Sequence, residues 1–513
     1  MPENSPQNPS SNTTQFPHIE SEVYLDRYKL SVNDRLSYWS ARAEEYLDWE
    51  VPFKQVEVIK DQQAQWFVGG ELNIAYNCLD RHLETKEDDI AIIWCAEEEG
   101  VDRKISYKQL HSEVELLANG LHAKGLQQGE KVCLYATMLP EIIVSMLACA
   151  RLGLIYEFID MELDFSAIEK QVDSIQPKLI ITADHGARSG EEYSFFNSVQ
   201  LLCEKCESVD NVIVIRSRGN EVSLTEGRDH WYHDVTRATN PKAPLASVAA
   251  TSPLFMSYQH QYEGAHLGYI NAGYLLYCAI TYRYVFDYQD GDVFWCAANF
   301  NKVSGHALAI WGALANGSTT VIYDGDANRL PLKRFWQIVE QYQVNILYAR
   351  EDGLESLVAN DVQAIERESW RSLRVVGLAY SENNQGVIEA CQRLSFDHCE
   401  IITTTNLHNT GQILFAHSAS SDAVHGMGDP FFGIMPVIVD DNNQEVEEIE
   451  TSGALKLQQS WPSQNRLYLD SDISEPESEM STLVGQWEPG NDCIHTGLMV
   501  ARDAANNFYL LKG

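Results

Sequence analysis

Short apolar segments alternate with helical segments over most of this chain, and this alternation constrains the fold more than any other feature. Lys131–Tyr135 is a mostly apolar run of the length that is typical of a buried strand. Pro140 then opens a helical segment, Glu141–Arg151, and Gly153 ends it. Because single strands that alternate with helices pair in parallel, the pattern predicts a doubly wound, mainly parallel α/β fold.

The alternation occurs twice, so we expect two related α/β subdomains. From Phe432 onward, short segments separated by a turn predict antiparallel strands and a small β-rich subdomain. We predict a disordered tail at 1–22, an α/β body at 23–430 and the β-rich subdomain at 431–513. The expected strands are Ala91–Cys95, Lys131–Tyr135, Lys178–Thr182, Asn211–Ile215, Asp292–Ala297, Thr319–Tyr323, Asn345–Tyr348, Leu373–Ala379, Ile434–Asp440 and Ala454–Gln458, and the expected helices lie within Ser31–Val51, Ser106–Gly125, Glu141–Arg151, Tyr274–Ile280, Gly305–Ala315 and Leu332–Gln341.

The net charge of −37, from 74 acidic and 37 basic residues, limits the partners of the chain. Nucleic acids and anionic membranes require clustered Lys and Arg, so neither is expected as a partner. Adaptation of the surface to a salty environment is an alternative cause of the charge. The chain has no apolar run long enough to span a membrane, and its polar N-terminus is not a secretory signal. The 11 cysteines, scattered mostly within apolar runs, indicate a reduced, cytoplasmic protein.

The stretch Ser252–Tyr274 has the pattern of a strand, a loop and a helix, which can form a phosphate cradle from backbone N–H groups. The expected loop is Gln259–Gly268. A phosphate site needs glycines, hydroxyls and a lysine. The loop offers Gly264 and Gly268 but no Ser, Thr or Lys, and it contains Glu263. The pattern therefore predicts a backbone arrangement that could bind a phosphate, but without the side chains that normally hold one.

Several segments resemble those of AMP-forming acetyl-CoA synthetases, in the adenylate-forming superfamily. The similar segments include 66–82, 287–296, 314–320 and 430–433. The resemblance implies the fold of the large N-terminal domain of these enzymes. It also implies a two-step reaction, in which a carboxylate and Mg·ATP give an acyl-adenylate and the thiol of CoA then displaces AMP. The cofactors of the family are ATP, Mg²⁺ and CoA, and we expect them to bind weakly here or not at all.

The same resemblance locates remnants of the family's sites. It implies nucleotide-site remnants, acyl-pocket remnants and one CoA-site remnant, and we assign no catalytic residue and no metal ligand. The nucleotide-site remnants are Gly264, Thr404, Thr410, Gly411, Thr496 and Gly497, the acyl-pocket remnants are Val303 and Ser304, and the CoA-site remnant is Arg188.

The chain departs from the family pattern at positions that the resemblance assigns to chemistry. Leu498 stands at the ribose-binding aspartate, and it cannot accept hydrogen bonds from ribose hydroxyls. Asn409 stands at the Mg²⁺-binding glutamate, where a neutral amide is a weaker ligand. Asn406 replaces the tryptophan that restricts the acyl pocket to acetate, and Glu191 replaces a CoA-site arginine. We therefore expect a degenerate, C-terminally truncated member, without the family's C-terminal domain.

Three hypotheses follow. The first is a pseudoenzyme, an acetyl-CoA-synthetase-like body kept for binding or regulation. The second is an active acyl–CoA ligase with rebuilt chemistry or with the missing domain supplied in trans. The third is a scaffold that pairs with a full-length acetyl-CoA synthetase paralogue or with itself through its acidic segments. A hydrolase is disfavoured because Ser304-Gly305-His306 lacks the G-x-S-x-G pattern. The residues that could supply charge to an active ligase are His260, His266, Lys302 and His408, and the acidic segments are Glu445–Glu450 and Asp470–Glu479.

Overall fold

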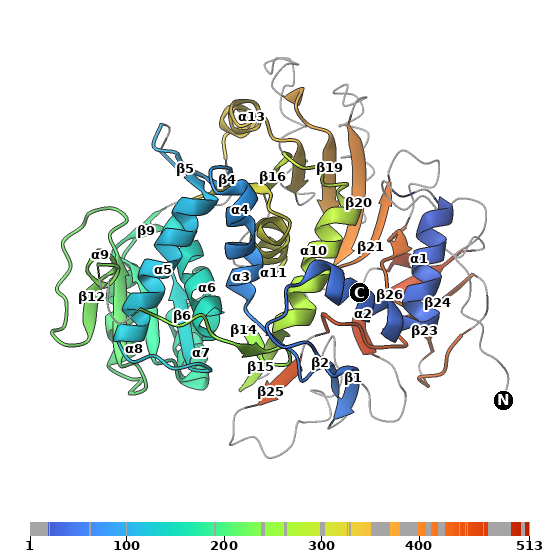
Figure 1. Ribbon diagram of the computed structural model, residues 1–513, viewed down its shortest axis with the longest axis horizontal. Helices are drawn as coiled ribbons and strands as arrows, with labels where there is room; N and C mark the ends of the chain where they lie inside the picture. Colours follow the sequence, from blue (N-terminus) through green and yellow to red (C-terminus); the bar gives the residue numbers. More distant parts are fainter. Residues whose placement is uncertain are drawn as a thin grey trace.

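Two large sheets and one small sheet organise the chain (Figure 1). The architecture comes from a computed structural model. It describes residues 19, 21–60, 63–98, 100–188, 191–237, 242–260, 264–297, 303–325, 327, 330–349, 370–379, 399–406, 412–418, 426–440, 442–446, 448, 450–464, 466–469, 494–503 and 508–511.

The first large sheet has eight strands in the order β12-β11-β8-β6-β7-β14-β15-β25. Its strands from β12 to β14 are parallel, and β15 and β25 are antiparallel to their neighbours. The strands are β6 (Lys131–Tyr135), β7 (Ile155–Phe158), β8 (Leu179–Ala183), β11 (Asn211–Ile215), β12 (Asp229–Trp231), β14 (Pro253–Tyr258), β15 (Ala265–Ile270) and β25 (Arg466–Leu469).

The second large sheet has nine strands in the order β22-β21-β20-β19-β18-β16-β17-β4-β5. The six strands from β20 to β4 in this order are parallel, and antiparallel strands flank them on both sides. The strands are β4 (Ile90–Cys95), β5 (Arg103–Ser106), β16 (Val293–Cys296), β17 (Thr319–Tyr323), β18 (Ile346–Ala349), β19 (Val375–Ala379), β20 (Glu400–Asn406), β21 (Ile413–Ser418) and β22 (Asp429–Pro430).

The small sheet is antiparallel, with the order β23-β24-β26-β27. Three two-stranded ribbons complete the β-structure: β1 with β2, β3 with β13, and β9 with β10. The strands of the small sheet are β23 (Pro436–Val439), β24 (Thr451–Leu457), β26 (Ile494–Arg502) and β27 (Phe508–Leu510). Those of the ribbons are β1 (Gln55–Lys60), β2 (Gln63–Val68), β3 (Glu71–Leu72), β9 (Gly186–Arg188), β10 (Glu191–Tyr193) and β13 (Val248–Ala249).

Local signals in the sequence set the ends of the helices. Ser106 caps α5 with a capping box, because its side chain accepts from the Gln109 N–H and the Gln109 side chain accepts from the Ser106 N–H. Gly153 ends α6 in the left-handed conformation that glycine adopts without strain. The helices are α1 (Ser21–Asn33), α2 (Arg35–Tyr46), α3 (Ile74–Cys78), α4 (Leu83–Lys86), α5 (Tyr107–Ala123), α6 (Pro140–Leu152), α7 (Phe165–Ile175), α8 (Phe195–Cys203), α9 (Tyr232–Val235), α10 (Asn271–Val285), α11 (Val303–His306), α12 (Ala313–Ala315) and α13 (Leu332–Gln341).

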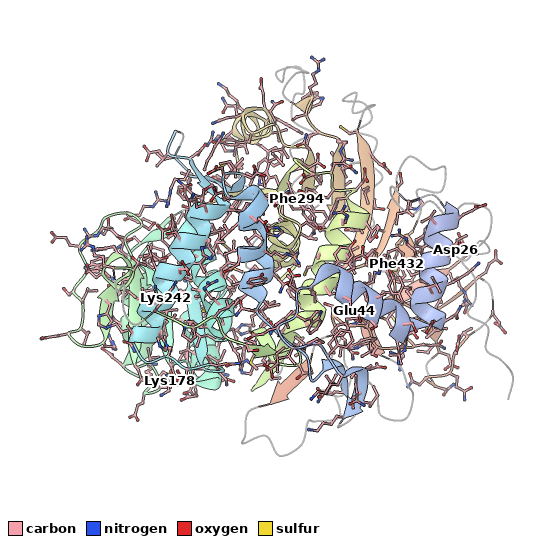
Figure 2. All side chains as sticks on the ribbon, in the orientation of Figure 1. Asp26, Glu44, Lys178, Lys242, Phe294 and Phe432 are labelled. Atoms are coloured by element: carbon pink, nitrogen blue, oxygen red, sulfur yellow. The ribbon has the colours of Figure 1, made fainter. Side chains whose placement is uncertain are left out.

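One hydrophobic cluster includes buried residues from both large sheets. All residues of α6 except Glu141 are buried, and α10 crosses the centre of the molecule almost wholly buried (Figure 1). Figure 2 shows side chains filling the space between the ribbons, and two of the labelled ones, Phe294 and Phe432, are fully buried members of this core. A helix that is buried on all sides belongs to the interior of a large domain.

Helix α1 is hydrogen-bonded to residues 430–434, which are distant from it in the sequence. Tyr24 and Tyr28 of α1 donate hydrogen bonds from their hydroxyls to the backbone carbonyls of Pro430 (2.7 Å) and Ile434 (2.9 Å). The Gly433 N–H donates to the Ser31 hydroxyl at 2.8 Å. These contacts join residues about 400 positions apart in the sequence, so α1 belongs to the folded body.

The α/β fold with two mainly parallel sheets and a β-rich part is confirmed. Two details differ from the sequence prediction. Helix α1 begins at Ser21, inside the range predicted as a disordered tail. Strand β25 comes from the range assigned to the β-rich subdomain but pairs with β15 of the first sheet. The predicted domain boundary at 431 stays a prediction.

Candidate nucleotide and acyl site

The predicted phosphate loop lies at the tip of a β-hairpin and not at the start of a helix. Strands β14 and β15 pair antiparallel, with Ser257 opposite Leu267 and Tyr258 opposite His266. Helix α10 begins only after β15, at Asn271. The expected strand–loop–helix arrangement is therefore wrong. The strand β15 forms because all six of its residues are buried, with the Tyr269 ring stacked on Phe255 at 4.2 Å between centroids.

Gly264 is at the point where the hairpin turns back into β15. Its φ of 76° is in the left-handed region, which glycine adopts without strain. Its N–H donates to the Tyr258 hydroxyl at 3.4 Å. This remnant of the nucleotide site thus has a structural use in the hairpin. Glu263 lies outside the described residues, as do the other remnants Thr410 and Gly411 and the position Asn409.

Polar side chains gather where β18 and β20 approach their carboxyl ends. The hydroxyl of Tyr348 is 3.0 Å from the Thr404 hydroxyl and accepts from the Asn406 amide nitrogen, also at 3.0 Å. Thr404 also donates to the Leu378 carbonyl at 3.3 Å. Ligands of open α/β sheets bind beyond the carboxyl ends of the strands, so this is the expected side of the sheet. Sequence reasoning missed Tyr348, although its place at the end of a predicted strand was a usable signal.

The amide oxygen of Asn406 is buried and has no hydrogen-bond partner among the described residues. The resemblance assigns this position to the acyl pocket. A buried acceptor without a partner is costly unless a ligand or another group donates to it. The assignment of Asn406 to an acyl pocket stays a prediction, and the structure places a polar acceptor at this position.

Strand β26 carries the next two remnants, Thr496 and Gly497. The Thr496 hydroxyl donates to the Leu455 carbonyl at 2.6 Å and accepts from the Leu498 N–H at 3.2 Å. The Leu498 side chain is half-buried and packs against the main core. The position that the resemblance assigns to ribose binding thus carries an aliphatic side chain.

Val303 and Ser304, the acyl-pocket remnants, form the first turn of α11. This helix continues as a π-helical segment, Ala307–Gly312, and then as α12. Such segments are frequent at functional sites. His306, at the end of α11, is buried, and its ring lies 4.5 Å from the ring of Phe158. The helix therefore connects the acyl-pocket remnants to the first sheet.

Arg188, the CoA-site remnant, is at the end of β9. Its guanidinium donates to the Leu163 carbonyl at 2.5 Å and lies 4.8 Å from the Tyr193 ring centroid. Glu191 stands directly opposite Arg188 in the β9–β10 pairing. The arginine is already engaged by protein groups, and its nearest strand neighbour carries negative charge.

A buried acid beneath the hairpin was not predicted. Glu157 on β7 is fully buried and lies 3.1 Å from His266 of β15. It also accepts from the Tyr258 N–H at 2.9 Å and the Gln171 amide at 2.6 Å. His266, expected in the loop, is therefore a buried strand residue. The signal that could have found Glu157 is an acid inside an apolar strand.

The described residues contain no group of three or more His, Cys, Asp and Glu side chains placed to hold a metal ion. In the same part of the chain, no helix is both long and apolar enough to cross a membrane, and no disulfide joins the cysteines. Lys302, His408 and the segment Asp470–Glu479 lie outside the described residues.

Comparisons with known proteins define the class. The pattern of the family described as "AMP-binding enzyme" matches residues 79–258 and 266–461, and that described as "Acetyl-coenzyme A synthetase N-terminus" matches residues 24–78. The acetyl-coenzyme A synthetase of Alkalilimnicola ehrlichii is 34% identical over 503 residues, which are 97% of this chain and 77% of the relative. Acetyl-coenzyme A synthetase 2 of Pseudomonas aeruginosa is 34% identical over 456 residues, covering 88% and 70%.

A solved structure, the acetoacetyl-CoA synthetase from Streptomyces lividans, superimposes with a TM-score of 0.80 at 18% identity and covers 96% of this chain and 75% of that one. The fold is thus that of an acyl-CoA synthetase N-terminal domain. The chain belongs to the AMP-binding enzyme family, and the relatives it matches there are acetyl-coenzyme A synthetases.

Proposed function

We propose that this chain keeps the adenylate-forming fold without the ATP-dependent ligation, and that it acts by binding or regulation. The hairpin between β14 and β15 carries the proposal. Its segment Gln259–Gly268 holds no lysine, serine or threonine, and the match to the AMP-binding family is interrupted between 258 and 266. The chain thus departs from its family where the phosphates of ATP would be held.

The other two cofactor positions support the same proposal. Leu498 packs against the core and offers no acceptor to a ribose. Arg188 is held by the Leu163 carbonyl and the Tyr193 ring, opposite Glu191. The residues present therefore fit ATP and CoA poorly, and we derive no reaction step through either.

An active acyl–CoA ligase is the second candidate. The identity of 34% over 97% of the chain favours it, because the relatives concerned are named as synthetases. The polar side chains of Thr404, Tyr348 and Asn406, which gather at the end of the sheet, also favour a polar ligand there. The predicted partner, a full-length acetyl-CoA synthetase or a second copy of this chain, stays a prediction.

Calorimetric titration with Mg·ATP and with AMP tests the nucleotide site. The wild-type chain is expected to give no saturable heat at millimolar nucleotide, and tight binding of Mg·ATP would contradict the proposal. Leu498→Asp is expected to raise the affinity for AMP by at least about tenfold, because a carboxylate accepts from the ribose hydroxyls and even one hydrogen bond to a charged group contributes about 1.5–3 kcal/mol, where about 1.4 kcal/mol is a factor of ten in affinity. Met499→Asp is the matched control, since successive strand side chains point to opposite faces.

A further inference from the structure

We propose that Ser174 is an activated serine that accepts an acyl group from an activated ester or thioester. Its partners are His266 and Glu157, and the three residues come from α7, β15 and β7. His266 lies within the segment Gln259–Gly268 of the predicted phosphate site, but the proposed acyl transfer does not require ATP.

The distances are those of a hydroxyl, a base and an orienting acid. The Ser174 Oγ lies 2.7 Å from His266 Nε2, and His266 Nδ1 lies 3.1 Å from Glu157 Oε2. A nucleophile within hydrogen-bond reach of a base, itself oriented by a third group, is the general signature of covalent catalysis. Such arrangements recur on unrelated folds and are recognised by geometry, not by sequence order.

The hydrogen bonds of Glu157 fix the orientation of the imidazole. Its second oxygen accepts from the Tyr258 N–H and from the Gln171 amide, so this carboxylate serves as an acceptor throughout. A carboxylate facing Nδ1 holds the proton of a neutral imidazole on that nitrogen. The Nε2 atom is then the acceptor that faces the Ser174 hydroxyl. Glu157 is in this sense a positioning residue.

Burial separates the roles of the three side chains. Glu157 is fully buried and His266 is 3% exposed, whereas Ser174 lies in the last turn of α7 and is only partly buried. The acid and the base are thus shielded from water. Ser174 is the least buried of the three residues, so it is the one that an electrophile can reach.

The chemistry is a single acyl transfer. The Ser174 oxygen attacks the carbonyl carbon while His266 Nε2 takes the hydroxyl proton. The bond from carbon to the leaving thiolate or alkoxide then breaks, and His266 returns the proton to that group. Because the C-terminal turn of a helix leaves carbonyls and not N–H groups unpaired, α7 itself supplies no oxyanion donors. We therefore assign acylation of Ser174 and not rapid hydrolytic turnover.

A fluorophosphonate probe tests the proposal, because displacement of its fluoride by the serine oxygen mimics acylation. We expect labelling of the full chain at Ser174, no labelling of Ser174→Ala, and labelling slowed by at least about a hundredfold in His266→Asn. Ser166→Ala, at an exposed serine of the same helix, is expected to label like the wild type. Labelling no faster than that of the heat-unfolded chain, or labelling retained in Ser174→Ala, would overturn the proposal.

A cysteine variant separates activation from a merely structural hydrogen bond and does not depend on the stability of His266→Asn. The thiol of Ser174→Cys is expected to react with iodoacetamide with a pH midpoint well below about 8.5, because a neighbouring histidine stabilises the thiolate. Ser166→Cys is expected to keep a midpoint near that ordinary value. Identical pH profiles for the two variants would show that His266 does not activate position 174.

Discussion

Replacement of Glu157 by alanine is expected to lower the free energy of unfolding by about 3–5 kcal/mol. The substitution leaves the Tyr258 N–H and the His266 Nδ1–H buried without their acceptor. It also removes one of the two acceptors of the Gln171 amide, which keeps the Phe158 carbonyl at 3.0 Å. The loss should appear in urea unfolding followed by tryptophan fluorescence.

The matched control is Glu169→Ala on α7, the helix that carries Gln171. Glu169 pairs with Lys205 at 2.6 Å, and that lysine side chain is 54% exposed. Surface pairs of this kind contribute about 0–1 kcal/mol. If both variants shifted the urea midpoint by the same small amount, the network around Glu157 would not be holding β7, β14, β15 and α7 together.

Asp429→Asn is expected to stabilise the protein at neutral and alkaline pH. Burial raises the pKa of Asp429 from 3.8 to about 7. The folded state therefore holds a proton that the unfolded state has released between these two values, and stability falls as pH rises through this range. The expected gain of Asp429→Asn above pH 7 is at most about 4 kcal/mol, since each pKa unit corresponds to about 1.4 kcal/mol.

The charge of Asp429 also acts on two neighbouring tyrosines of α1. The hydroxyls of Tyr24 and Tyr28 lie close enough that the Asp429 charge raises their pKa further, although burial is the larger cause. Melting curves between pH 4.5 and pH 8 should show a weaker pH dependence in Asp429→Asn. Asp440→Asn is a control of opposite sign, because backbone N–H donors lower the pKa of the exposed Asp440. A wild-type-like pH dependence in Asp429→Asn would contradict the assignment.

The fold was predictable where local signals decide the structure. Strand β6 spans the predicted residues Lys131–Tyr135, and α6 begins at Pro140 and ends before Gly153, because proline and glycine fix helix ends whatever surrounds them. The β14–β15 hairpin was not predicted. The glycines and His266 suggested a loop, whereas the segment is a strand because it pairs with β14 and β25 and is buried, with Tyr269 stacked on Phe255 across the hairpin.

The assignment of the site residues from the resemblance stays a prediction, and their contacts could not be predicted from the sequence. Thr404, Thr496 and Arg188 lie on the strands β20, β26 and β9. Each of these side chains contacts a group that is distant in the sequence. The Thr404 hydroxyl contacts the Tyr348 hydroxyl, the Thr496 hydroxyl donates to the Leu455 carbonyl, and the Arg188 guanidinium donates to the Leu163 carbonyl. The Glu157–His266 pair joins residues 109 positions apart, and no local pattern in the sequence encodes such a contact.

The measurement that tests the central claim most directly is acetate-dependent exchange of pyrophosphate into ATP. It would use the purified chain with Mg²⁺, a complete acetyl-CoA synthetase as the positive control and the heat-inactivated chain as the baseline. If the chain keeps the adenylate-forming fold but not the ligation reaction, the exchange rate stays at the baseline with or without acetate. Acetate-dependent exchange above the baseline would contradict this account and establish the chain as an active acyl-adenylate-forming enzyme.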